Sequence, residues 1–188
     1  MRVSALVSVL VCLMVGPVGA HPHVFIDYAV MLVVSADRVT GVRLTWTFDE
    51  LFSGFIVQEF DKDRNGALSP AEVQRIEATH LAELQKAAYY TTLNVNGKPG
   101  PSPVAREFRA TAVKGIVSYE FTLPLALPLA STTAMEILID DPVYYIAYNP
   151  VSVAPQAQTF GAYVVECRVA RDQTGTTPDA VRCGIRRR

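Results

Sequence analysis

Hydrophobic positions recur with a period of two along most of the chain, which predicts β-strands. Residues 24–35 (VFIDYAVMLVVS) carry β-branched and aromatic side chains on both faces, a composition typical of a buried strand. Val42, Leu44 and Trp46 then alternate with polar residues, which predicts a half-buried strand. The same reasoning predicts further strands over residues 104–113, 116–123, 134–139, 143–148 and 160–169.

The hydrophobic period changes to that of a helix in two segments that follow the second predicted strand. Apolar residues recur at helical spacing over residues 52–60 and again over residues 73–84, with a short polar loop between them. We therefore expect a mainly β fold: a single β-sandwich or partly open barrel over residues 21–188, with a helix pair inserted at residues 48–88. Residues 184–188 are expected to form a basic, flexible, solvated tail.

The first 20 residues have the features of a secretory signal peptide. Arg2 supplies a positive start, and residues 3–15 form an apolar run that is too short to span a bilayer. Small residues at positions 18–20 (VGA) form a cleavage site. We expect cleavage after Ala20, export to the periplasm and no membrane span in the mature chain.

Charge and cysteine content narrow the class of protein. The formal net charge of the 188 residues is −1, so no basic field favours nucleic acid as a partner. Cys12 would leave with the signal peptide, and Cys167 and Cys183 would then face an oxidising compartment, where a disulfide is expected. It would stabilise the fold by about 3 kcal/mol. A metal site is the less favoured alternative, because the two thiols lack C-x-x-C spacing.

Residues 61–72 (DKDRNGALSPAE) match the spacing of an EF-hand calcium loop. Short oxygen-bearing side chains at alternate positions bring several ligands to one hard cation, and Gly66 permits the sharp turn between them. The long Glu72 side chain closes the site with both of its oxygens. The expected calcium ligands are Asp61, Asp63, Asn65, the backbone carbonyl of Ala67, Ser69 and Glu72.

A helix–loop–helix without an ion is the alternative interpretation of this segment. Ser69, Pro70 and Glu72 alone make a good helix start, with an N-cap, a proline in the first turn and a capping box. That alternative does not require the acidic residues at positions 61 and 63. Because no second loop is present to pair with the first, Leu68 should pack against the β-sandwich, and we expect a weak, structural calcium site with a Kd of about 10⁻⁴–10⁻³ M.

His21 and His23 flank Pro22 directly after the predicted cleavage site. Cleavage would give His21 an α-amine beside its imidazole, and these two nitrogens together with the His23 imidazole suit a transition metal. In an extended chain Asp27 lies on the same face, where it would be a direct ligand or an acceptor for a ring N–H. The alternative is that His21 is a frayed terminus and His23 an ordinary residue at a strand edge.

Other polar positions have more ordinary interpretations. Asp141 precedes Pro142, as in many turns, and residues 46–50 (WTFDE) predict a core strand followed by a helix N-terminus. His80 is expected on the surface of the second helix. The chain carries no nucleophile-elbow, zinc-protease or phosphate-loop motif, and we do not expect an enzyme.

Four stretches taken together resemble an exported family of unknown function that is often labelled a periplasmic component of an ABC-type transport system. They are HPHVFID at the predicted mature start, WTFDE, the hand-like loop, and DDPVYYIAY at residues 140–148. The resemblance runs from His21 to about Cys183. It implies a link to membrane transporters for transition metals such as nickel, cobalt or zinc.

The same resemblance implies a metal-binding role for His21 and His23, and also for Asp27, Asp49 and Asp141. The chain is too short for a two-lobed solute receptor, so we expect an accessory protein of a transition-metal (nickel, cobalt, zinc or copper) transport system that also holds a structural Ca²⁺. One alternative is a copper-dependent oxidative enzyme with an amino-terminal histidine brace. Another is a calcium-stabilised interaction module that binds no transition metal.

Overall fold

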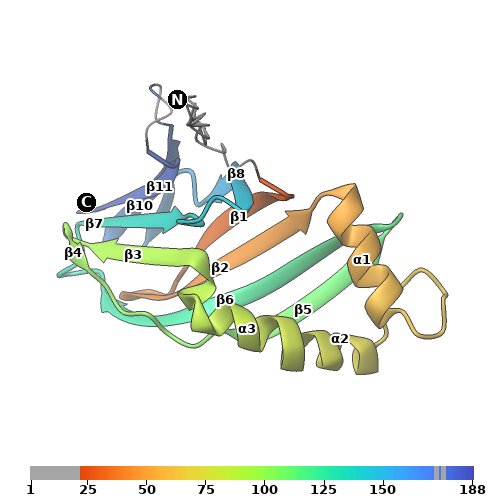
Figure 1. The fold of residues 1–188 in the computed structure, drawn as a ribbon. Coiled ribbons are helices and arrows are strands. Elements are labelled where there is room, and N and C mark those ends of the chain that lie inside the picture. Colours follow the sequence, from red (N-terminus) through yellow and green to blue (C-terminus); the bar gives the residue numbers. More distant parts are fainter. Residues whose placement is uncertain (1–21, 172–173, 175–176) are drawn as a thin grey trace, which may run out of the picture.

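The computed structural model describes residues 22–171, 174 and 177–188. The predicted signal peptide, its cleavage site and His21 lie outside the described residues. The strands of the described part form two sheets and no closed barrel, and a short helical insert follows β2 (Figure 1). The predicted mainly β class is therefore confirmed. No helix in this part has the length and apolar character needed to cross a bilayer.

The first sheet has five strands in the order β5-β6-β2-β1-β8. Within it β1 pairs antiparallel with β2 and parallel with β8. The strands are β1 (Val24–Val34), β2 (Arg38–Phe48), β5 (Arg106–Val113), β6 (Ile116–Pro128) and β8 (Ile146–Ala154).

Only one face of β1 is buried, so the prediction of a strand buried on both faces is wrong. Ile26 and Tyr28 point into the core, whereas Phe25 and Met31 are 54% and 39% exposed. The reason is that the other layers of the fold cover the inner face of the first sheet and leave its outer face to solvent. Apolar residues on the outer face of β1 mask this alternation in the sequence.

The second sheet has six strands in the order β4-β3-β7-β11-β10-β9, and every pairing in it is antiparallel. The strands are β3 (Thr91–Val95), β4 (Lys98–Pro99), β7 (Ala134–Ile139), β9 (Gln158–Phe160), β10 (Tyr163–Ala170) and β11 (Ala180–Arg187).

Strand β11 corrects the prediction of a basic tail at residues 184–188. Residues 184–187 belong to this strand, which lies between β7 and β10 in the middle of the sheet. Val181, Cys183 and Ile185 are buried, while Arg182 and the neighbouring polar positions face solvent. The period of two was therefore present in the sequence, but the density of arginines concealed it.

The helical insert consists of two packed segments that cover one end of the first sheet (Figure 1). The second segment keeps its direction through a π-helical turn. Ile76 and Leu81 are five residues apart, and both are buried. An ordinary α-helix would place them on different sides, and the extra residue of the π turn brings both into the core. The elements are α1 (Glu50–Phe60), α2 (Pro70–Ile76), the π turn (Glu77–Leu81), α3 (Ala82–Lys86) and a 3₁₀ turn (Ala88–Tyr90).

The core is one cluster that joins both sheets and the helices. The Trp46 ring lies near its centre, with ring centroids 5.2 Å from Phe121 and 5.3 Å from Tyr148. On the inner face of the first sheet, Tyr119 contacts the helical insert, and the Tyr28 hydroxyl donates to the carbonyl oxygen of Asp179, directly before β11. The second sheet and the helices therefore both pack against that face.

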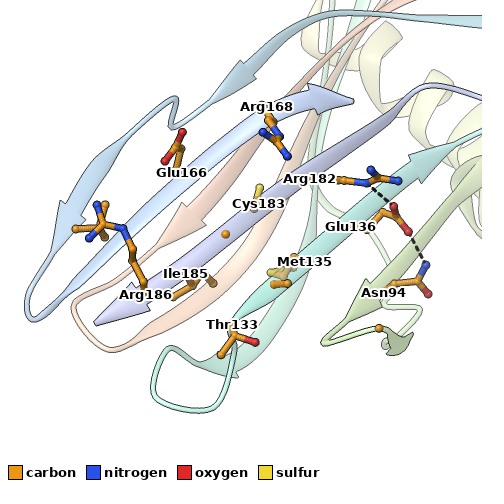
Figure 2. Close-up of a pocket in the computed structure, with 14 residues that line it drawn as sticks. Asn94, Thr133, Met135, Glu136, Glu166, Arg168, Arg182, Cys183, Ile185 and Arg186 are labelled. Carbon is orange, nitrogen blue, oxygen red and sulfur yellow. Dashed lines mark hydrogen bonds and ion pairs between the residues drawn. The ribbon is translucent and has the colours of Figure 1, made fainter. Parts of the chain in front are cut away.

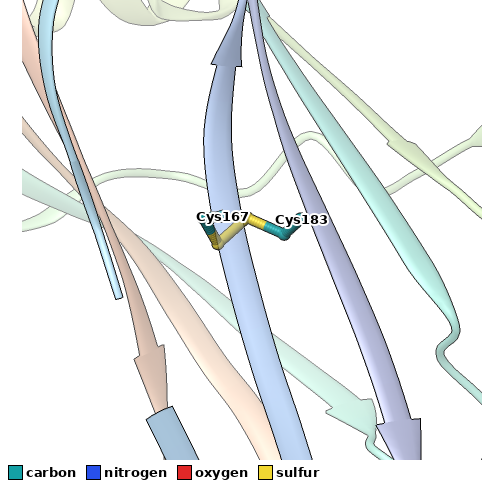
Figure 3. The surroundings of a disulfide bond; sticks show 2 residues. All are labelled: Cys167 and Cys183. Carbon is teal, nitrogen blue, oxygen red and sulfur yellow. A yellow bond between two sulfur atoms is a disulfide. The ribbon is translucent and has the colours of Figure 1, made fainter. Parts of the chain in front are cut away.

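Cys167 and Cys183 form the predicted disulfide, which joins β10 to β11 (Figure 3). The two residues are register partners on neighbouring strands, and both are buried. The bond therefore crosses directly between two central strands of the second sheet.

Replacing both cysteines (Cys167→Ala with Cys183→Ala) should lower the free energy of unfolding by about 3 kcal/mol, because the bond closes a loop in the unfolded chain. Urea denaturation of the oxidised wild type and the double variant measures this loss. Wild-type protein unfolded in reducing agent is the matched control, because it loses the bond without losing side-chain atoms. Equal midpoints for oxidised and reduced wild type would contradict the expectation.

Candidate metal centre

The loop of residues 61–72 begins where α1 ends and finishes inside the first turn of α2. Asp61 is the C-cap of α1, and Ser69 is the N-cap of α2 in a capping box with Glu72. Gly66 has a φ of 80°, in the left-handed region that favours glycine. Leu68 is partly buried and packs against the core cluster, which includes residues of the helices as well as of the sheets.

Three carboxylates of this loop converge. One oxygen each from Asp61, Asp63 and Glu72 lie within 4.8 Å of one another, and this is the one such group of His, Cys, Asp or Glu within the described residues. Asp61 and Glu72 are buried, at 7% and 4% exposure, while Asp63 is exposed. Burying two neighbouring carboxylates is unfavourable unless hydrogen bonds or a cation offset their charge.

Backbone N–H groups of the loop supply part of that compensation. The Asp61 carboxylate accepts from the N–H groups of Asn65 and Gly66 at 3.1 and 2.9 Å. Glu72 accepts from the N–H groups of Ser69 and Lys62 at 2.8 and 2.7 Å, and from the Ser69 hydroxyl at 2.8 Å. These bonds, led by that from the Ser69 backbone, hold the pKa of the Glu72 carboxyl below its ordinary value.

The remaining predicted calcium ligands lie along the same short loop. The Asn65 side chain donates to Asp63 at 2.9 Å and accepts from the backbone N–H of Ala67 at 2.8 Å. Oxygen is the donor type that Ca²⁺ and Mg²⁺ prefer, and the loop offers carboxylate, amide and carbonyl oxygens together. Lys62 and Arg64 are exposed beside them and partly offset their negative charge.

His23 lies directly before β1. Its backbone N–H donates to the carbonyl oxygen of Tyr145 at 2.8 Å, and the two rings lie 5.0 Å apart. Asp27 is exposed on the outer face of the first sheet, where it accepts from the Asn149 side chain at 2.8 Å. His23 and Asp27 are both exposed.

Asp141 is buried and serves its own loop. Its carboxylate accepts from the backbone N–H groups of Val143, Tyr145 and Ile146 at 2.9–3.1 Å. These bonds hold residues 142–145 in a turn, so β8 begins at Ile146 and not at Val143 as predicted. Asp141 therefore fixes the turn against which His23 rests, but it does not form a close group of ligand atoms with His23 and Asp27 in the part described.

Asp49 links the start of α1 to the start of β1. One carboxylate oxygen caps α1 by accepting from the Phe52 N–H at 2.8 Å, and the other accepts from the Phe25 N–H at 2.8 Å. The predicted helix start at residues 46–50 is confirmed. Asp49 thus orients the helix that leads to the acidic loop and also the first residues of β1 that follow His23.

His80 is half-buried, so the prediction of a surface position is wrong. Its Nδ1 atom lies 2.8 Å from the Tyr119 hydroxyl, and its ring packs edge-on against Phe60 at 4.9 Å. Burial lowers the pKa of the imidazole and raises that of the Tyr119 hydroxyl. The π turn that carries His80 toward the sheet is the reason, and the five-residue step from Ile76 to Leu81 was its signal in the sequence.

Comparison with known proteins gives a family but no activity. The family described as "Protein of unknown function (DUF1007)" matches residues 6–180. An uncharacterised protein of Haemophilus influenzae is 28% identical over 153 residues, which cover 79% of this chain and 71% of that relative. No solved structure matches the chain.

The His80→Gln variant, which lacks the half-buried imidazole, should lose less free energy of unfolding than wild type when the pH is lowered mildly. In the unfolded chain His80 binds a proton near its ordinary pKa of 6.5, and in the folded chain burial lowers that pKa. Below pH 6.5 the unfolded state therefore gains a proton first, so wild-type stability falls until the pH passes the folded pKa.

Urea midpoints measured at intervals from neutral pH downward test this difference. All other titrating groups are shared by the two proteins, so the difference between their curves reports His80. Parallel curves for wild type and His80→Gln would contradict the assignment.

Proposed function

The chain belongs to this family of unknown function, and we propose that it is an exported metal-binding accessory protein with a structural Ca²⁺ in the loop of residues 61–72. One observation carries the calcium site: the carboxylates of Asp61, Asp63 and Glu72 converge within 4.8 Å in a loop with EF-hand spacing. A bound cation would offset the charge of the two buried carboxylates and hold α1 against α2.

A transition metal is proposed at the mature amino terminus, on the α-amine and imidazole of His21 and the imidazole of His23. Asp27 is the proposed nearby acceptor, and Asp141 contributes by holding the turn at Tyr145. The support is that His23 is exposed while its backbone is anchored to that turn. Nitrogen donors of this kind suit nickel, copper, zinc and cobalt better than Ca²⁺.

Export to the periplasm is proposed together with this site, because only cleavage after Ala20 would expose the required amine. The disulfide of the second sheet supports an oxidising compartment. The proposed partner is a membrane transporter for the same metal, which the family resemblance implies.

A calcium-stabilised interaction module without a transition metal is the second candidate. Leu51 and Phe55 lie one turn apart on α1 and are 67% and 58% exposed. Neighbouring exposed apolar side chains favour contact with another protein. Metal analysis of the protein with its native amino terminus separates the two candidates.

Wild-type protein should bind Ca²⁺ with a Kd of about 10⁻⁴–10⁻³ M in calorimetry. At ten times Kd the ion should raise the free energy of unfolding by about 1.4 kcal/mol. Glu72→Gln should weaken binding by at least about tenfold, because the amide supplies one neutral oxygen in place of two charged ones. Glu77→Gln is the matched control, since Glu77 is exposed just outside the loop. No response to Ca²⁺ at about 10 mM would contradict the proposed calcium site.

Protein isolated with a native His21 amino terminus should hold one transition-metal ion, measured by elemental analysis and by calorimetry. Adding one alanine before His21 should remove most of the affinity, because the amine would no longer share a residue with the first imidazole. His23→Gln should also weaken binding, and His80→Gln should not, because its ring is bonded to Tyr119. Unchanged affinity in the extended protein, or processing elsewhere than after Ala20, would overturn this part of the proposal.

A further inference from the structure

A hollow of about 660 Å³ lies on the outer face of the second sheet (Figure 2). Side chains from β3, β7, β10 and β11 line it, and their inner-face neighbours belong to the core. It involves neither the acidic loop nor the residues around His23. The volume falls in the range of small-molecule sites.

Gly184 leaves the floor of this hollow open. Its register partners are Ala134 on β7 and Glu166 on β10, so it occupies the middle of three paired strands. A Cβ atom added at Gly184 would meet no atom within 4 Å. Glycine weakens a strand interior and often marks the close approach of a ligand. Packing does not require glycine here, and a side chain would fill the hollow.

Two arginines face each other beside that floor. Arg168 and Arg182 are register partners on β10 and β11, and like charges directly opposite each other destabilise a sheet. The Arg182 Nε donates to Glu136 at 2.9 Å, and Glu136 also accepts from the Asn94 side chain at 3.2 Å. Arg168 makes no hydrogen bond or ion pair with any residue that the structure describes. Among the residues that the structure describes, none compensates its charge.

The disulfide holds these arginines in place. Cys167 and Cys183 are register partners one position away from Arg168 and Arg182, on the opposite face of the sheet. A crosslink at this point limits sliding and separation of β10 and β11, so the two guanidinium groups stay in register before any ligand arrives. Such pre-organisation reduces the entropy lost on binding.

The charges in the hollow favour an anion. Arg168, Arg182 and Arg186 line it with Glu136 and Glu166, and Glu136 is already paired. We propose that the hollow over Gly184 binds a small organic anion with two or more carboxylate or phosphate groups, held chiefly by Arg168 and Arg182. The planar guanidinium group donates two parallel hydrogen bonds to either kind of group. Glu166 opposes the same anion from the other side of the floor.

Calorimetry of the mature chain with succinate and with pyrophosphate tests the proposal, at low ionic strength so that screening is small. Succinate reports carboxylate binding and pyrophosphate reports phosphate binding. Arg168→Gln should weaken the binding of the preferred probe by about tenfold or more without lowering the thermal midpoint of the unliganded protein. Gly184→Leu should abolish binding because its side chain fills the floor, and Glu166→Gln should strengthen it.

Arg109→Gln, which changes an exposed arginine on β5 of the other sheet, is the matched control and should bind like wild type. If either probe also chelated a bound metal, that contribution would be the same in all these variants. Differences in probe affinity among the variants therefore report binding in the hollow. If Gly184→Leu unfolds early, Gly184→Ser replaces it. Failure of wild type to bind either probe would overturn the proposal, as would wild-type affinity in Arg168→Gln. Binding of a polyglutamate peptide alone would overturn it as well.

Discussion

The fold depends on covering the inner face of the first sheet. That face carries large aromatic residues, among them Trp46, Tyr119 and Phe121, which are each no more than 1% exposed. The second sheet covers one part of it, and the helical insert covers the rest. Each layer alone would leave aromatic surface in water, at a cost of roughly 25 cal/mol per Å². The two layers are therefore held by one shared core.

This constraint explains the irregular features of the insert. The π turn at residues 77–81 lets Ile76 and Leu81 both point into the core, and it brings His80 to the Tyr119 hydroxyl as a consequence. The acidic loop projects from the far end of this insert, so its shape is linked to how α1 and α2 pack. Hydrogen bonds from loop N–H groups to Asp61 and Glu72 already order the loop around its carboxylates. A cation bound there would strengthen an arrangement that the core has positioned.

Asp49 and the disulfide likewise fix the geometry of the segment that follows His23 and of the outer face of β10 and β11. Asp49 caps α1 and holds the backbone of Phe25, so the chain that leaves His23 is tied to the helix that leads to the loop. Cys167 and Cys183 fix the register of β10 and β11, and with it the outer-face positions of Arg168 and Arg182. In both cases a single side chain or crosslink fixes the backbone near a surface several residues away.

Local patterns in the sequence were sufficient for the features that depend on neighbours in the chain. The period of two predicted most strands, the spacing of residues 61–72 predicted the loop, and the capping box placed the start of α2. The cysteine pair and the helix start at Asp49 were also readable, because disulfide chemistry and N-capping depend on residue type. Strand β11 shows the same pattern, and its arginines led to the wrong prediction of a tail.

Only the tertiary structure decided which faces are covered and which residues meet across the sheets. Phe25 is as apolar as Ile26, and it is exposed because none of the described elements covers the outer face of the first sheet. His80 is half-buried against Phe60 and Tyr119, which are remote from it in the chain. The opposition of Arg168 and Arg182 over an open glycine floor arises from the pairing of β10 with β11. Burial and strand register are set by the assembled layers, whereas the period of a segment is set by its own residues.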